Sequence, residues 1–262
     1  MLSEPNIVPV TDETKPTPSA GGLTSFTLKI VAIIAMTCNH AAYVFYPHLP
    51  YWPRCVLLAV GGLTFPVMAF LLVEGYIHTS NIRRYGERLL AFALVSEVPF
   101  WLFLGHEGNV LFTLLGGLAA LWIVDNVENP WARTILVLGI CLATWVCDWG
   151  TVGPVLVLLF YMLREKPGGT AIAMLVPIGI GLYSTIGHFV DALAEGSWRN
   201  LPFVLYYAVG NTAAIPLLMA YNGQRGRSLK WFFYLYYPAH IAVLGIIHLL
   251  VFGDMPRLMV GF

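Results

Sequence analysis

The chain has 262 residues, of which 58% are hydrophobic and only 11% are charged, and its formal net charge is zero. Soluble domains carry about a quarter charged residues, so this chain has too little polar surface to cover a soluble globule of its length. Its apolar runs do not alternate with polar residues, which excludes an outer-membrane barrel, and the zero net charge indicates no nucleic-acid partner. We expect an all-α protein embedded in a lipid bilayer.

The first 22 residues differ from the rest of the chain. They are rich in Pro, Thr, Ser and acidic residues, and they lack the apolar core of a signal peptide. We expect a short disordered cytoplasmic tail over residues 1–22 and one transmembrane domain over residues 23–262.

Nine apolar segments follow and predict a polytopic bundle, since about 20 helical residues cross ~30 Å of hydrocarbon. The nine cover residues 27–46, 55–77, 87–104, 110–124, 132–146, 151–163, 170–188, 201–221 and 231–252, and the fourth to sixth are short. If all nine cross from a cytoplasmic N-terminus, only Arg54, Arg199 and Arg257 of the 14 Lys and Arg residues lie outside. The excess of cations on one side predicts a cytoplasmic N-terminus and an external C-terminus.

The first segment, LKIVAIIAMTCNH at residues 28–40, contains two ionisable side chains. Lys29 and His40 are eleven residues apart, about three helical turns or ~16 Å, so they share one face of the helix. Ionisable groups inside a membrane are costly and are usually functional. His40 is either a core histidine bonded to a neighbouring helix or a functional group.

The second segment ends with Glu74 and His78, an i,i+4 pair on one helical face. The pair either caps the helix locally or belongs to a ligand site, and no metal is expected because no H-E-x-x-H motif or cysteine pair completes one. Arg83, Arg84 and Arg88 follow at the cytoplasmic entrance of the third segment. They either set the topology and bind anionic lipid, or clamp a phosphate group.

Glu97 lies in the apolar core of the third segment, at a depth comparable to that of His40. An unpaired carboxylate there would recruit a partner, so we predict that Glu97 orients His40. Other polar groups fall in or beside the later segments. They are Asn109 and Thr113 at the outer end of the fourth, Asp148 at the outer end of the fifth, and Tyr237 and His240 in the inner half of the last.

Five stretches resemble the TraX family, membrane proteins linked to N-terminal acetylation of conjugative pilin. The stretches are LKIVAIIAMTCNH, FPVMAFLLVEGYIHTSNIRRYGERLLAFALVSEVPF, NVLFTLLGGL, the DWG at residues 148–150, and KWFFYLYYPAH, and the resemblance covers roughly residues 27–250. The family usually has Asp-His in the first segment, whereas Asn39 precedes His40 here. The Lys29-x10-His40 spacing is also similar to the Arg/Lys-x10-His motif of membrane acyltransferases that use acyl-CoA.

The resemblance implies an inner-membrane N-acetyltransferase that moves acetyl from acetyl-CoA to the N-terminal amine of a pilin subunit. His40 would be the general base, or would carry the acetyl group itself, with Glu97 and Lys29 as catalytic partners. Coenzyme A would be held by Arg83, Arg84, Arg88, Glu74 and His78, and the site would be lined by Asn39, Asn109, Thr113, Asp148, Tyr237 and His240. A non-acylating pilin maturation factor or chaperone, and a proton-coupled transporter, remain alternatives.

Overall fold

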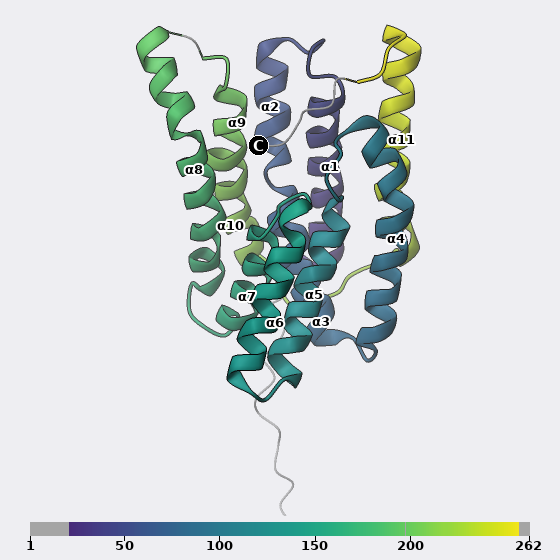
Figure 1. Ribbon diagram of the computed structural model, residues 1–262, viewed down its shortest axis with the longest axis vertical. Coiled ribbons are helices and arrows are strands. Elements are labelled where there is room, and N and C mark those ends of the chain that lie inside the picture. The colour runs from purple at the N-terminus through teal and green to yellow at the C-terminus, as the bar shows by residue number, and fades with distance from the viewer. Residues whose placement is uncertain (1–20, 197, 257–262) are drawn as a thin grey trace, which may run out of the picture.

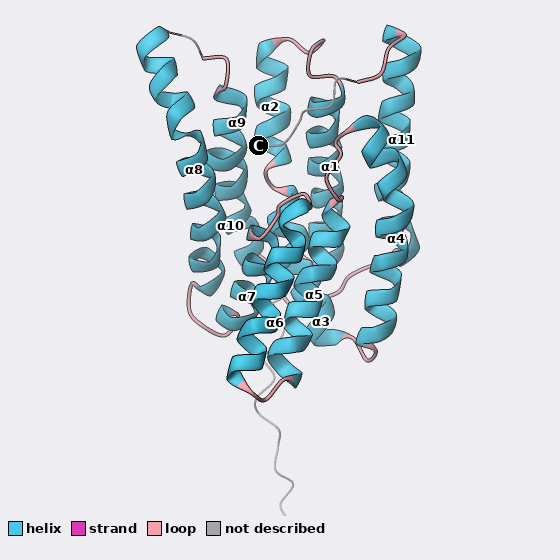
Figure 2. Cartoon of the chain, in the orientation of Figure 1, coloured by secondary structure: helices cyan, strands magenta, loops and turns pink. Residues whose placement is uncertain are grey.

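The computed structural model describes residues 21–196 and 198–256, and within these ranges the ordered elements are helices, with no strand (Figure 2). The helices stand side by side in one bundle with roughly parallel axes (Figure 1). The all-α prediction is therefore confirmed for the part of the chain that the structure describes. Apart from Gly21 and Gly22, the predicted tail lies outside the described residues.

The chain runs up and down the bundle, and each of the nine predicted segments is helical. Two of the segments are composite, because α2 and α3 together form the second, and α9, a π-helical stretch and α10 together form the eighth. The helices are α1 (Ser25–Val44), α2 (Tyr51–Gly61), α3 (Thr64–His78), α4 (Ile82–Phe103), α5 (Val110–Asn126), α6 (Pro130–Ala143), α7 (Val152–Leu163), α8 (Gly169–Glu195), α9 (Leu201–Leu205), α10 (Thr212–Met219) and α11 (Lys230–Phe252), with a 3-10 turn at Thr144–Val146 and the π-helical stretch at Tyr206–Asn211.

The two composite segments touch where each is irregular. A Cβ atom added to Gly62, in the break between α2 and α3, would lie 2.9 Å from the Cα of Gly210 in the π-helical stretch, and one added to Gly210 would lie 2.4 Å from the Ala59 carbonyl oxygen. Only glycine at both positions permits this approach of the two backbones. The paired irregularities thus fix how these two segments cross.

In the part of the chain that the structure describes, five helical segments are long and apolar enough to cross a membrane, namely residues 25–44, 51–78, 169–194, 201–219 and 231–252. In contrast, α5, α6 and α7 have 17, 14 and 12 residues. They lie together in the lower half of the bundle, and their upper ends stop near its middle (Figure 1). At 1.5 Å per residue, α7 is only about 18 Å long, which is less than the ~30 Å of a hydrocarbon core.

This arrangement sets the depth of three polar residues that were predicted at the ends of these segments. Asn109, Thr113 and Asp148 lie at or beside the ends of α5 and α7 that stop near the middle of the bundle. Asn109 and Thr113 are fully buried. The sequence showed that the segments were short, but their length alone did not say at which depth they end.

Cationic loops gather at one end of the bundle, which we call the mouth end. Arg225 and Arg227, between α10 and α11, share a cavity with Arg88 of α4. Arg164 and Lys166, after α7, border a neighbouring pocket with Glu74 of α3, which also lines that cavity. At the opposite end, which we call the far end, the Tyr51 hydroxyl donates to the Trp198 carbonyl oxygen at 2.7 Å, which joins the loops next to Arg54 and Arg199. The described cations are thus distributed as predicted, and the orientation in the membrane stays a prediction.

Candidate active site: a cationic mouth and a histidine pair

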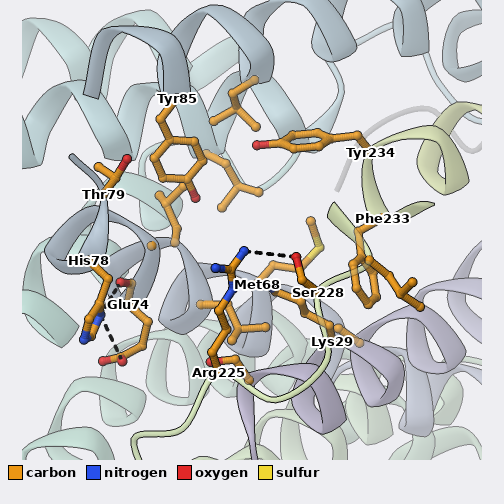
Figure 3. A pocket seen from close by; sticks show the side chains of 18 of the residues that line it. Lys29, Met68, Glu74, His78, Thr79, Tyr85, Arg225, Ser228, Phe233 and Tyr234 are labelled. Atoms are coloured by element: carbon orange, nitrogen blue, oxygen red, sulfur yellow. Dashed lines mark hydrogen bonds and ion pairs between the residues drawn. The ribbon is translucent and has the colours of Figure 1, made fainter. Parts of the chain in front are cut away.

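A cavity of about 530 Å³ opens at the mouth end, between α1, α3, α4, α11 and the loop that precedes α11 (Figure 3). Four cationic side chains line it: Lys29, Arg88, Arg225 and Arg227. Its remaining lining is largely apolar and includes Met36, Met68, Leu72, Leu111, Leu114 and Tyr237. The cavity therefore combines a site for a multiply charged anion with an apolar interior.

The loop that carries two of these arginines is fastened to the start of α1 by backbone hydrogen bonds. Leu23 N–H donates to the Ala220 carbonyl at 2.7 Å, Ser25 N–H to Gln224 at 2.8 Å, and Phe26 N–H to Arg225 at 3.1 Å. These bonds also satisfy amide groups at the helix N-terminus, which otherwise lack partners. The loop is thereby held as a strap over the mouth.

Within this strap the Arg225 side chain reaches across the opening (Figure 3). Its Nη2 donates to Ser228 Oγ at 3.1 Å, which limits its freedom to turn away. Lys29 also lines the cavity, with Nζ 5.5 Å from the ring centroid of Phe233. Positive charges that are already in place bind an anion with less ordering of side chains than free ones.

The predicted Glu74 and His78 pair lies on the other side of the opening. His78 Nδ1 is 2.9 Å from the Glu74 carbonyl oxygen and 3.9 Å from its carboxylate. Tyr221, in the loop after α10, hydrogen-bonds to Ser25 Oγ at 3.0 Å. Burial raises the pKa of the Tyr221 phenol above its ordinary value, and the nearby Glu74 carboxylate raises it further. The phenol is therefore a neutral hydrogen-bonding group at the rim.

The inner end of the cavity lies next to His40. Met36, one helical turn before His40, and Tyr237 both line the cavity, and the rings of His40 and Tyr237 lie 6.0 Å apart between centroids. His40 Nδ1 is 2.6 Å from His240 Nε2, and the two imidazole rings are stacked with centroids 4.9 Å apart. His40 and His240 are 5% and 7% exposed. A buried histidine pair thus joins α1 to α11 just beyond the cavity.

The hydrogen bonds of the pair determine which nitrogen of each ring carries the proton. His240 Nδ1 is 2.8 Å from the Tyr236 carbonyl oxygen, which can only accept, so Nδ1 is the N–H of His240. Its Nε2 is then an acceptor, and His40 Nδ1 must be the donor. In the neutral pair His40 Nε2 therefore carries a lone pair and is available as a base.

A further bond between the same helices holds the pair in place. Thr37 Oγ1 and the Tyr236 hydroxyl are 2.6 Å apart, and the Tyr236 ring stacks on His240 at 5.0 Å between centroids. Thr37 precedes His40 by three residues and Tyr236 precedes His240 by four, so this contact lies about one turn nearer the mouth. The register of α1 against α11 is thereby set at two successive levels.

Glu97 does not orient His40, so that prediction is wrong. The Glu97 carboxylate instead accepts hydrogen bonds from Asn109, from the backbone N–H at 3.1 Å and from Nδ2 at 2.6 Å. Asn109 Nδ2 also donates to the Ala93 carbonyl, and its Oδ1 caps α5 by accepting from Leu111 N–H. Depth along a helix could be read from the sequence, but the direction that Glu97 faces depends on which helix packs against α4.

Because of this cap, the N-terminus of α5 points into the bundle beside Tyr237. The Tyr237 side chain is 2% exposed, and its hydroxyl makes no hydrogen bond within the described part of the chain. The backbone of Val110, the first residue of α5, is the polar group next to it. Behind α5, the Thr113 hydroxyl donates to the Asp148 carbonyl oxygen. The Tyr237 hydroxyl and the N-terminus of α5 thus lie beside each other at the inner end of the cavity, and the Glu97 carboxylate is bonded to Asn109 at that same N-terminus.

The fold and this geometry can now be compared with known proteins. Residues 25–248 match the model of the family described as TraX protein. This chain belongs to the TraX family. It is also 32% identical over 240 residues, 84% of this chain and 93% of the relative, to a probable fimbrial assembly protein FimC, serogroup H1, from Dichelobacter nodosus. No solved structure matches the chain. The predicted family is confirmed.

Only one of the three arginines that were predicted to clamp a phosphate in this TraX protein lies at the cavity. Arg88 lines the cavity, whereas Arg83 and Arg84 do not. Arg83 is 90% exposed and pairs with Glu87 at 2.8 Å. The reason is that α4 begins at Ile82, five residues earlier than predicted, so these two residues occupy its exposed first turn.

Asn39 is likewise apart from the cavity. Its side chain packs against Gly61 of α2, where an added Cβ would meet its Oδ1 at 2.7 Å. The mouth instead contains Arg225 and Arg227, which the sequence indicated only as part of the excess of cations on the cytoplasmic side. Their spacing in GQRGRSLK, two arginines separated by a glycine, is the signal that could have identified them.

Proposed function

We propose that this protein transfers the acetyl group of acetyl-CoA to the N-terminal amine of a pilin subunit at the bacterial inner membrane. The observation that carries the proposal is the cavity that leads from four cationic side chains to the region beside the His40–His240 pair. The distribution of charge supports a cytoplasmic mouth end, the side on which coenzyme A is found.

The two parts of the cavity suit the two parts of coenzyme A. The phosphate groups would bind Lys29, Arg88, Arg225 and Arg227, since guanidinium groups make bidentate contacts with phosphate. The thioester arm would extend along the apolar lining toward Met36 and Tyr237. Lys29 and His40 are eleven residues apart, or ~16 Å along the helix, so the thioester arm would need to extend about this far from the phosphate groups.

The lone pair of the neutral acceptor amine would attack the thioester carbonyl carbon, and His40 Nε2 would take a proton from that nitrogen as the C–N bond forms. The C–S bond would break at the same carbon. The coenzyme A thiolate would leave and take up the proton from His40. His240 would hold the ring of His40 in the reactive tautomer, the role that a third group has in other acyl transfers.

Charge also develops on the thioester oxygen during this reaction. The Tyr237 hydroxyl lies at the inner end of the cavity without a hydrogen-bond partner among the described residues, and it would donate to that oxygen. Donors fixed in a dry site stabilise an oxyanion without reorganising, and a single one is typically worth about a hundred-fold or more in rate. Tyr237 would then contact the reacting group.

A pilin subunit is the acceptor that the family and the relative favour. The relative from Dichelobacter nodosus is named for fimbrial assembly, and it aligns with most of this chain. A non-acylating assembly factor is the second candidate, because that name says nothing of acetyl transfer.

Two measurements separate the candidates. Purified protein should bind acetyl-CoA, whereas an assembly factor or a proton-coupled transporter should not. Intact-mass spectrometry of pilin should show one acetyl group in cells with the parental protein and none in cells with His40→Ala. His188→Ala is the matched control, because His188 lies on α8 away from the cavity lining. Pilin that is equally acetylated with His40→Ala would refute the catalytic role of His40.

A further inference from the structure

At the far end of the bundle, three residues with metal-binding side chains converge. They are His48 in the loop after α1, His248 near the end of α11, and Asp254 just after α11. One ligand atom from each lies within 4.8 Å of the other two. None of them lines the cavity at the mouth end. We propose that these three side chains bind a divalent zinc ion.

The state of His248 is the independent observation that points to a ligand. Its side chain is 1% exposed, yet Nε2 has no hydrogen-bond partner among the described residues. The other nitrogen, Nδ1, lies 3.1 Å from the Asp254 carbonyl oxygen and 4.0 Å from the Asp254 carboxylate. A buried imidazole normally satisfies both nitrogens, so this one lacks a partner. A bound ion would supply it.

Aromatic rings and a backbone carbonyl fix the orientation of the His248 ring, as similar groups usually do for a metal ligand. Phe45 and Phe252 pack against it, with ring centroids 5.7 and 5.0 Å away. The His48 ring lies 5.4 Å from it and stacks on Phe252. Metal-binding histidines are commonly held by a second bond to a backbone carbonyl, as His248 is by Asp254.

The chemistry of the three groups favours a borderline transition-metal ion. Two imidazoles and one carboxylate suit Zn²⁺, which is typically held by three protein ligands and one water when the site is open. Ca²⁺ and Mg²⁺ prefer shells made almost wholly of oxygen, and Cu⁺ prefers sulfur ligands, which the trio lacks. His48 and Asp254 are exposed, so the ion can enter from the aqueous side.

The ion would tie the α1–α2 loop to the end of α11. These are the two helices that carry His40 and His240, so the same pair of helices would be joined at the far end as well. Because His48 and His248 are 200 residues apart in the chain, a shared ion would close a long loop and stabilise the folded bundle against unfolding.

The test uses the full-length protein in detergent without a polyhistidine tag, stripped with EDTA and dialysed. Zn²⁺ is titrated in competition with a chromophoric chelator, and thermal unfolding is followed with and without Zn²⁺. One Zn²⁺ per chain should bind and should raise the unfolding temperature. His48→Ala and Asp254→Asn should each weaken binding by at least about ten-fold, and both residues are exposed, so folding should be preserved.

His188→Ala serves as the control for loss of a histidine elsewhere and should bind Zn²⁺ like the parent. Acetyl-CoA binding should be unchanged in His48→Ala, which keeps this test separate from that of the cavity. Absence of Zn²⁺ binding by the parental protein would overturn the proposal. So would equal Zn²⁺ affinities for the parent, His48→Ala and Asp254→Asn.

Discussion

Replacing His240 by alanine tests the proposed orientation of His40 most directly. In the structure, His240 Nε2 is the acceptor for His40 Nδ1–H at 2.6 Å, and His40 is only 5% exposed. The substitution leaves that N–H without its partner, and the His40 ring becomes free to turn or to exchange its proton between nitrogens. His40 Nε2 would then be the lone-pair nitrogen for only part of the time.

The size of the effect follows from this one lost bond. Leaving a buried donor unsatisfied costs about 1–3 kcal/mol, or roughly ten- to hundred-fold in a rate that depends on this orientation. Loss of general-base catalysis altogether would cost about 10²–10⁴-fold, so His240→Ala should fall below His40→Ala in severity. The loss should lie in kcat, because His240 does not line the cavity.

The assay is acetyl transfer to a pilin N-terminal peptide in membranes, measured across a range of pH and of acetyl-CoA concentration. A reduced kcat with an unchanged KM for acetyl-CoA, and a displaced pH profile, is the expected result. Tyr236→Phe is the comparison variant, since it removes the other α1–α11 side-chain bond, to Thr37, but keeps the carbonyl that His240 contacts, and it should lose less activity than His240→Ala. Parental kcat in a well-folded His240→Ala protein would refute the reasoning.

The remaining predictions concern the mouth, the cap of α5 and the topology. Arg225→Ala should weaken acetyl-CoA binding by about ten- to hundred-fold, which is the contribution of one charge-assisted contact. Arg83→Ala, which changes an exposed residue, should leave the affinity unchanged, and equal affinities in the two variants would exclude a special role for the strap. Glu97→Gln should lower the unfolding temperature while leaving the pH profile of transfer unchanged, and a displaced profile would instead connect Glu97 to the base. A membrane-impermeant thiol reagent should label Gly261→Cys but not Thr17→Cys in intact spheroplasts. The reverse pattern would show that the bundle has the opposite orientation in the membrane.

The helices could be predicted because their signal is local. Hydropathy and length give the position of each segment, and all nine predicted segments are helical in the described residues. Residues of one helix can also be placed on a common face, as Lys29 and His40 were. Neither the position of a segment nor the face that its residues share shows which other helix packs against that face. The partner of His40 was therefore missed, although His240 itself had been recognised as a residue of the site.

The short helices and the proposed zinc ligands also depend on contacts between segments that are distant in the sequence. The lengths of α5 to α7 were apparent from the sequence, but the depth at which these helices end depends on the helices around them. The depth of Asn109 and Asp148 in the bundle could therefore not be predicted. His48 and His248 are far apart in the chain and match no ligand spacing, so no metal was expected from the sequence. Only folding brings them together.

The strap at the mouth also determines where the polypeptide leaves the bundle. Gly22 has φ of +101°, and a Cβ there would lie 2.7 Å from the Ala220 carbonyl oxygen, so Gly22 lies directly beside the loop that carries Arg225. A fluorescent protein or affinity domain fused ahead of residue 23 would therefore sit at the entrance and compete for space with a large nucleotide ligand. Fusion after α11 would place the same cargo at the opposite end, so the position of a tag alone should change the measured affinity for acetyl-CoA.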